Sequence, residues 1–404
     1  MKTKVIGASK VFLCNENFDI LENGAIAFNE KILEAGDFQT LASKYQNATF
    51  YEQRVLLPSF INPHIHFEFS NNTTAFIYGG FDKWLTSIMQ NRDTILQDNT
   101  QAIKEAIKEQ LESGVGSVGA ISSYGDDMIE LAKSPLKVLF FNEIIGSNPS
   151  AVDFLYSNFL ERLEASKKLA TKKFIPSIAL HSPYSVHYIL AKKVIELAKR
   201  ENLKTSVHFL ESHQEREWLE KSSGWFKSFY EQTLKLKDAK SLYTIQDFLA
   251  LFEGMDTLFV HCLFANKEEL QSICKSGSVI SCPRSNRLLN NKIFNLDSIP
   301  SEKISIATDG KSSNNNLNFL DELRYTLFAY NTKDPLELSK TLLLSSTNFA
   351  AKALKLNNGI LQKNKDADFT LFEIPNITAS SQEALQFILH AKKKEKIFIN
   401  GEEF

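Results

Sequence analysis

Eight apolar, strand-like runs recur through the middle of the chain, and helical stretches separate most of them. The runs are VLLPSFINPHIH, VGSVGAIS, KVLFFNEIIG, FIPSIALH, KTSVHFLE, TLFVHCLF, SVISCP and KISIATDG. Stretches such as NTQAIKEAIKEQLESG and AKKVIELAKREN have the apolar spacing of amphipathic helices. This alternation predicts an α/β fold with a parallel sheet covered on both faces, and eight units favour a closed (β/α)8 TIM barrel. The alternative is an open doubly wound sheet, but no glycine-rich phosphate loop follows the first strand.

The two ends of the chain have a different pattern. KVIGASKVFLC and GAIAFNEKILEAGDF lie near the start, and ADFTLFEI and EKIFINGEEF lie near the end. These segments are rich in β-branched and aromatic residues and are punctuated by turn residues, which predicts short strands. We expect residues 1–57 and 362–404 to form one small composite β-sandwich domain. The barrel then spans residues 58–361.

One insertion interrupts the pattern of the barrel. About 40 residues, 212–254, follow the fifth apolar run. Its first half is rich in aromatic side chains, namely Trp218, Trp225, Phe226, Phe229 and Tyr230. An aromatic insertion at this face predicts either a lid over a substrate or an extra pair of helices packed on the barrel.

Composition excludes some classes of function. The chain has 404 residues with a formal net charge of −2, and its basic residues form no patch, so nucleic acid is not an implied partner. No signal-peptide core opens the sequence, and no apolar run reaches the roughly 20 residues of a membrane span. The four cysteines lack CxxC spacing, which indicates reduced thiols in a cytoplasmic protein.

Two histidines end the first apolar run. Because side chains alternate along a strand, His64 and His66 point to the same side. In a barrel both can face inward at the C-terminal end, where barrel enzymes keep their chemistry. Two imidazoles there suit a divalent metal, although an isolated pair is also compatible with ordinary hydrogen-bonded histidines.

Ionisable residues also end three other runs. His208 and Glu211 end the fifth run, His261 ends the sixth and Asp309 ends the eighth. Buried charges need a partner or a metal, so core packing does not explain this set. Three imidazoles and a carboxylate at one mouth predict a mononuclear metal site with room for a water, whose pKa such a metal lowers to about 7.

These motifs together resemble the amidohydrolase superfamily, and the resemblance covers nearly the whole chain. SCPRSNRLL (281–289) and TDGKSSNNN (308–316) are similar to the branch of cytosine, guanine, triazine and adenosyl deaminases and chlorohydrolases. The resemblance implies that His64, His66, His208 and Asp309 bind one Zn²⁺ or Fe²⁺. Binuclear relatives have a bridging lysine or glutamate at the end of the fourth strand. Here His181 takes that place, which favours one metal.

The resemblance also implies the chemistry. Glu211 would take a proton from a metal-activated water and deliver it to a ring nitrogen, while His261 and Asp309 orient that water. Metal hydroxide would then add to the amidine carbon and ammonia would leave. The chain lacks the PCxxC signature of the other zinc deaminases.

Three further residues are candidates for substrate contacts. His181 could bind substrate or cap the following turn, and Trp84 could stack on a base or pack its helix. Glu68 is spaced to lie on the face of His64 and His66, where it could hold ribose hydroxyls or a ring N–H. Its alternative is a salt bridge to a neighbouring loop.

HIHFEFS is most similar to the aminofutalosine deaminases. That likeness implies deamination of 6-amino-6-deoxyfutalosine to futalosine, a step of menaquinone synthesis. The alternatives are deamination of S-adenosylhomocysteine, methylthioadenosine, adenosine or guanine, and hydrolysis of a cyclic amide or a C–Cl bond. A non-enzymatic assembly protein of the same fold is disfavoured because the chain keeps all the metal ligands and Glu211. A homodimer is compatible with the sequence.

Overall fold

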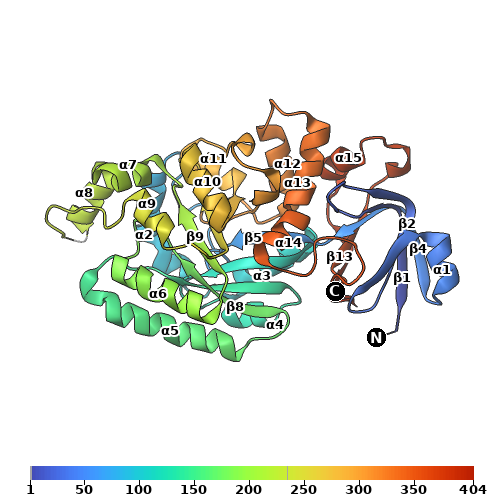
Figure 1. Cartoon of the computed structure of the whole chain (residues 1–404), viewed down its shortest axis with the longest axis horizontal. Helices are drawn as coiled ribbons and strands as arrows, with labels where there is room; N and C mark the ends of the chain where they lie inside the picture. Colours follow the sequence, from blue (N-terminus) through green and yellow to red (C-terminus); the bar gives the residue numbers. More distant parts are fainter. Residues whose placement is uncertain (1, 234) are drawn as a thin grey trace.

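The computed structural model describes residues 2–233 and 235–404, which form two sheets and the helices around them (Figure 1). The larger sheet has eight strands in the order β12-β11-β10-β9-β8-β7-β6-β5, and every neighbouring pair is parallel. Its strands are β5 (Phe60–Ile65), β6 (Val115–Ser122), β7 (Lys137–Ile144), β8 (Phe174–Leu180), β9 (Thr205–Phe209), β10 (Thr257–His261), β11 (Gly277–Ser281) and β12 (Ile304–Ile306).

Each of these strands coincides with one of the eight predicted apolar runs, although β11 begins one residue before its run. The backbone N–H of Asp309, just beyond β12, donates to the carbonyl of His64 in β5 at 3.2 Å. This bond brings the last strand of the sheet to the first. The predicted (β/α)8 barrel is therefore confirmed, and the open sheet is excluded.

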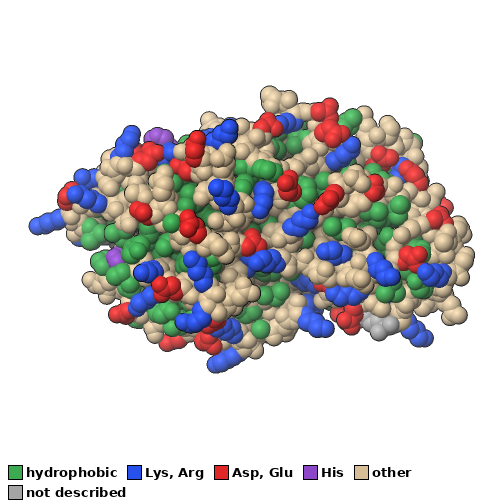
Figure 2. All heavy atoms as spheres, in the orientation of Figure 1, with side chains coloured by type: hydrophobic (Ala, Val, Ile, Leu, Met, Phe, Trp, Pro, Cys, Tyr) green, Lys and Arg blue, Asp and Glu red, His purple; other side chains and the backbone are tan. Residues whose placement is uncertain are grey.

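Helices surround the barrel. They are α2 (Phe81–Leu96), α3 (Thr100–Glu112), α4 (Met128–Lys133), α5 (Val152–Lys168), α6 (Tyr188–Glu201), α7 (His213–Lys221), α8 (Gly224–Thr233), α9 (Ile245–Ala250), α10 (Lys267–Ser276), α11 (Pro283–Asn290), α12 (Phe319–Ala329), α13 (Pro335–Ser345) and α14 (Asn348–Leu354). Short 3₁₀ turns are η1 (Pro149–Ala151), η2 (Leu296–Ser298), η3 (Ser301–Lys303) and η4 (Ile377–Ala379). No helix of the described residues is long and apolar enough to cross a membrane. On the face that Figure 2 shows, basic and acidic side chains are interspersed.

The smaller sheet takes strands from both ends of the chain, in the order β15-β14-β13-β4-β1-β2-β3. The strands are β1 (Lys4–Phe12), β2 (Ile20–Phe28), β3 (Ile32–Asp37), β4 (Ala48–Pro58), β13 (Phe369–Glu373), β14 (Lys394–Ile399) and β15 (Glu402–Glu403), with helices α1 (Phe38–Lys44) and α15 (Glu383–His390). The strands pair into one seven-stranded sheet, with register shifts such as that between Ala27 and Phe28, where a β-bulge bends a sheet. The division at residues 57 and 362 stays a prediction.

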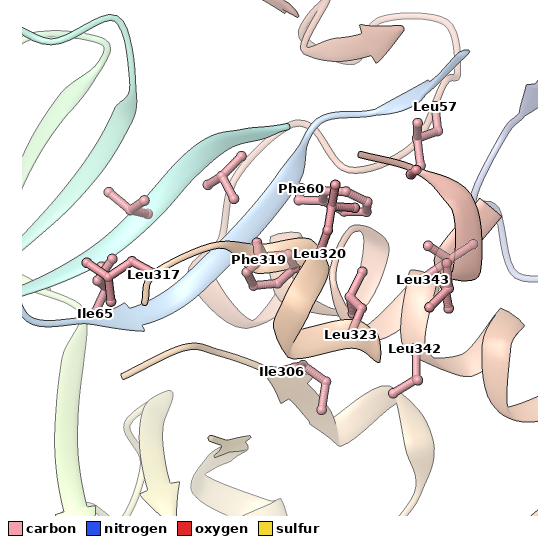
Figure 3. Close-up of a cluster of buried hydrophobic side chains, with 14 of the residues drawn as sticks. Leu57, Phe60, Ile65, Ile306, Leu317, Phe319, Leu320, Leu323, Leu342 and Leu343 are labelled. Atoms are coloured by element: carbon pink, nitrogen blue, oxygen red, sulfur yellow. The ribbon is translucent and has the colours of Figure 1, made fainter. Parts of the chain in front are cut away.

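Strand β4 leads directly into β5, with only Ser59 between them. The apolar letters VLLP therefore belong to the smaller sheet, and the first barrel strand begins at Phe60, later than the sequence pattern indicated. Figure 3 shows this continuous strand with Phe60 beside Phe319 and Leu320 of α12, and with Ile65 beside Leu317, just before α12. Leu57 belongs to the same buried cluster. One buried core thus spans the junction between the two sheets and holds the strand that carries His64.

Candidate active site

Strand ends at one mouth of the barrel bring together three imidazoles and a carboxylate. The Nε2 atom of His64 lies 3.5 Å from Oδ1 of Asp309, and Nε2 of His66 lies 3.6 Å from the same oxygen. Nε2 of His66 also lies 3.4 Å from Nε2 of His208. Asp309 has a positive φ of 59°, an uncommon backbone conformation for a residue other than glycine, and one that recurs at functional sites.

The donor set fits a divalent metal ion. His64 is fully buried, and neither of its ring nitrogens has a hydrogen-bond partner among the described residues. Ligand atoms of His64, His66 and His208 lie within 4.8 Å of one another, as do those of His64, His261 and Asp309. Burial, with the neighbouring His64, lowers the pKa of His66 to about 3, so its imidazole is neutral, which is the form that binds metals. Nitrogen and oxygen donors of this kind suit zinc or iron.

Outer hydrogen bonds fix the orientation of the histidine rings. Nδ1 of His208 lies 2.9 Å from the backbone carbonyl of His181, which leaves Nε2 directed toward His66. Nδ1 of His261 lies 2.8 Å from Oδ1 of Asn286, on α11. Such partners set the tautomer and the position of a metal-ligating ring.

The two motifs that narrowed the family resemblance hold Asp309 in place. The hydroxyls of Ser285 in SCPRSNRLL and Ser313 in TDGKSSNNN each donate to Oδ2 of Asp309 at 2.8 Å. Oδ1 is left facing the histidines. Burial raises the pKa of Asp309, but its interactions with His64, His66 and His261 outweigh this effect and hold that pKa well below the usual range.

Glu211 lies beside this cluster, with Oε1 at 3.7 Å from Nε2 of His261. Burial, reinforced by Asp309 and Glu215, raises the pKa of Glu211 well above its ordinary value. The backbone N–H groups of Leu210 and Glu211 donate to the buried carboxylate of Glu215 at 2.8 and 3.0 Å. This anchor fixes the turn after β9 and therefore the position of Glu211.

A cavity of about 260 Å³ opens onto the cluster, and His66, His208, Glu211, His261 and Asp309 form its inner wall. Apolar and aromatic side chains form much of the remainder: Phe69, Trp84, Leu85, Ile88, Met89, Ile145, Tyr184, Phe226, Phe229 and Tyr230. The last three belong to α8, at the far end of the molecule from the small sheet (Figure 1). The aromatic insertion therefore packs on the barrel and forms a wall of the cavity, while its role as a lid stays a prediction.

His181 and Trp84 both line this cavity, as their proposed substrate contacts require. Nδ1 of His181 lies 2.6 Å from the hydroxyl of Ser185, so its other ring nitrogen is left for a ligand. The indole N–H of Trp84 donates to the carbonyl of Ser312 at 2.8 Å. Whether either residue contacts a substrate stays a prediction.

Glu68 occupies a different place from the one expected. It does not line the cavity. Its carboxylate accepts hydrogen bonds from the backbone N–H groups of the loop after β6, at 2.8 Å from both Ser123 and Gly125, with Tyr124 and Asp126 slightly farther. A carboxylate saturated in this way has no free acceptor for ribose hydroxyls. Glu68 therefore holds a loop, through backbone hydrogen bonds and not the expected salt bridge.

Sequence reasoning missed Glu143, a buried residue of β7 that lines the cavity. The hydroxyl of Ser123 donates to its Oε2, while Oε1 has no hydrogen-bond partner among the described residues and lies 3.8 Å from Nδ1 of His208. Burial raises the pKa of Glu143 to about 8. A carboxylate inside the apolar run KVLFFNEIIG was a signal that could have identified it.

Fold and site together define a metal-dependent hydrolase, and the chain belongs to the amidohydrolase family, whose model matches residues 55–404. It is 45% identical to a Helicobacter pylori protein named adenosine deaminase, over 98% of each chain. It is 42% identical to the aminodeoxyfutalosine deaminase of Nitratiruptor, over 95% of this chain and 96% of that one.

Solved structures agree with this assignment. The crystal structure of Helicobacter pylori aminofutalosine deaminase in complex with methylthio-coformycin superposes with a TM-score of 0.95 at 44% identity, covering 99% of this chain and all of that one. A zinc-bound adenosine deaminase from Xanthomonas campestris has a TM-score of 0.79 at 20% identity, which shows the same fold. The resemblance to the amidohydrolases and to aminofutalosine deaminase is thereby confirmed.

Proposed function

We propose that the chain is an aminohydrolase that converts 6-amino-6-deoxyfutalosine and water to futalosine and ammonia, a step of menaquinone biosynthesis. One observation carries the proposal. The chain is 42% identical to an aminodeoxyfutalosine deaminase over nearly its whole length, and it has a complete set of metal-ligand and proton-transfer side chains at a cavity.

His64, His66, His208 and Asp309 would hold one divalent ion, with zinc as the ion proposed and iron as an acceptable substitute. A divalent ion with such ligands supplies Lewis acidity and lowers the pKa of water to about 7. The unpartnered ring nitrogens of His64 and the facing nitrogens of His66 and His208 support this assignment. Unbound, these buried nitrogens would have lost their hydration without compensation.

Glu211 would carry the proton. A carboxyl whose pKa is raised by burial can accept a proton from water and then donate it to the ring nitrogen next to the attacked carbon. His261, 3.7 Å away, would orient the water together with Asp309. The adenine-type ring loses its amino group as ammonia and gains oxygen at the same carbon.

A second candidate is a broader deaminase of adenine nucleosides. The 45% identical relative named adenosine deaminase supports it. So do more distant relatives, about 24% identical, named 5-methylthioadenosine/S-adenosylhomocysteine deaminases. All of these substrates present the same ring to the site, so the metal and Glu211 do not distinguish them.

The test is ultraviolet absorbance of the metal-loaded protein with 6-amino-6-deoxyfutalosine, adenosine, methylthioadenosine and S-adenosylhomocysteine. Conversion of an adenine ring to a hypoxanthine ring shifts the spectrum of all four. Much faster turnover of the first supports the proposal, and comparable rates on all support the broader deaminase. No turnover of any of the four, with the metal confirmed bound, would refute both.

A further inference from the structure

Helix α2 lays one face along the cavity. Trp84, Ile88 and Arg92 line it at intervals of four residues, which places them in one row on the helix, and Met89 lines it beside them. Arg92 is the only lysine or arginine among the described residues that line this cavity. Its side chain is 40% exposed, whereas that of His66 at the inner wall is 11% exposed. Arg92 therefore marks the outer end of the cavity.

Among the described residues, the guanidinium of Arg92 has only a weak ion-pair partner. Its one ion pair in the described residues is with the adjacent Asp93, at 3.1 Å, and the Asp93 side chain is 91% exposed. An exposed pair of this kind contributes little, so the guanidinium is available to a ligand. Five N–H donors in a planar fork match the two oxygens of a carboxylate.

Tyr124 lies beside Arg92 at the same end of the cavity. Both residues line the cavity, and burial raises the pKa of the Tyr124 hydroxyl, a shift that the Arg92 guanidinium opposes. Tyr124 is also fixed in place, because its backbone N–H donates to the buried carboxylate of Glu68 at 3.0 Å. A guanidinium and a phenol hydroxyl are thus both available as donors in the lining of one cavity.

The surroundings of this pair point to an anion on an apolar stem. The inner end of the cavity holds the proposed metal ligands and the carboxyl groups of Glu143, Glu211 and Asp309, where the adenine-type ring would bind. Arg92 gives the outer end the one guanidinium or ammonium group of the described cavity lining, which could offset an anion there. Apolar side chains of Ile88 and Met89 lie between the two ends along α2.

We propose that Arg92, with Tyr124, binds a carboxylate that the substrate carries at the end remote from its adenine-type ring, and that this contact determines substrate choice. The inference rests on the proposed deamination at the inner wall. 6-Amino-6-deoxyfutalosine carries such a carboxylate on a benzene ring, and S-adenosylhomocysteine carries one on an amino acid. Adenosine and methylthioadenosine carry none.

The test compares kcat/KM for these four substrates in the wild type and in Arg92→Met, Arg92→Lys and Tyr124→Phe. We expect Arg92→Met to lower kcat/KM for the anionic substrate by about tenfold or more, mainly through KM, and to change the neutral substrates less than about twofold. Arg92→Lys should retain part of the selectivity. Selective loss with 6-amino-6-deoxyfutalosine assigns the subsite to an aryl carboxylate, and selective loss with S-adenosylhomocysteine assigns it to an amino-acid carboxylate.

Lys83→Met is the matched control, because it removes one positive charge from the same helix at an exposed position outside the cavity. Equal loss on charged and neutral substrates in Arg92→Met, or no loss on any, would overturn the inference. Wild-type turnover decides the proposed function separately. Binding of futalosine by calorimetry gives a second readout without turnover, and Arg92→Met should weaken it by a similar factor.

Discussion

The Nε2 atoms of His66 and His208 face each other at 3.4 Å, although the two residues lie at the ends of strands on opposite sides of the barrel. Two neutral imidazoles in this position have their lone pairs available to one ion. We therefore expect His208→Ala to bind less than a tenth of the metal of the wild type, measured by elemental analysis after dialysis. Activity should fall in parallel.

The matched control for that substitution is His390→Ala, an exposed histidine at the end of α15. It should retain both metal and activity. Chelation of the wild type should abolish turnover and lower the melting temperature, because an ion that binds only the folded state stabilises it. Full activity in the demetallated protein would contradict the assignment of these ligands.

Glu211→Gln keeps the shape of the side chain but cannot accept and return a proton. General acid–base catalysis by a positioned group contributes about 10²–10⁴-fold, so kcat should fall by a factor in that range. Metal content and the circular dichroism spectrum should not change. The variant is checked by steady-state kinetics on metal-loaded protein, and undiminished kcat would show that the proton travels by another group.

Glu68→Gln should loosen the loop after β6 without touching the substrate. An amide oxygen accepts fewer of the loop N–H groups than a carboxylate does, and its NH₂ group faces donors. We expect a loss of about 1–3 kcal/mol in the free energy of unfolding, since buried donors are left unpaired. KM should rise more than kcat falls, because Tyr124 and Ser123 belong to the cavity wall.

Urea unfolding and steady-state kinetics measure these two effects. Glu52→Gln, at an exposed position of β4, is the control for the loss of one negative charge. If Glu68→Gln changed neither stability nor KM, the loop would be held by other contacts.

Glu215 makes the stability of the protein depend on pH. Burial raises its pKa from 4.5 to about 8 in the folded protein, against the effect of the backbone N–H groups that bind it. The folded protein therefore binds the proton of Glu215 more tightly than the unfolded chain does, and this difference adds to the free energy of unfolding. The added stability is complete below pH 4.5 and is lost as pH rises through about 8. Glu215→Gln should therefore flatten the decline of unfolding free energy between pH 5 and 8.5.

Denaturant titrations at several pH values test this, with Glu161→Gln on the exposed side of α5 as the control. The same decline in both variants would show that other groups set the pH dependence.

The strand ends of the barrel were predictable because one rule governs them all. Parallel strands put their carboxyl ends at the same mouth, so His64, His208, His261 and Asp309 had to meet once the eight runs were recognised. Glu68 was misplaced because β5 ends at Ile65, and the alternation of side chains does not continue past the end of a strand. The predicted alternation is correct within β5, but the sequence does not show that this strand ends at Ile65.

Arg92 had no usable signal in the sequence, and that of Glu143 was weak. Arg92 lies among polar residues of an amphipathic helix, where an arginine is most often solvated, and only the docking of α2 against the mouth turns it toward the cavity. In the sequence, Glu143 is a single charged residue in an apolar strand, and only the structure shows that it lies beside Nδ1 of His208. Such residues depend on contacts between distant elements, which no local pattern records.

The continuous strand from β4 into β5 has a consequence for synthesis of the protein. Strand β4 is flanked by β1 on one side and by β13 on the other, and β13 begins at Phe369, 60 residues after Asp309. When the ribosome has added the last residue of the proposed metal site, β13 has not yet been made. One edge of β4 therefore still lacks its partner strand. An unpaired edge invites pairing with another chain, so ribosome-bound or truncated chains that stop short of β13 are the forms of this protein most exposed to aggregation.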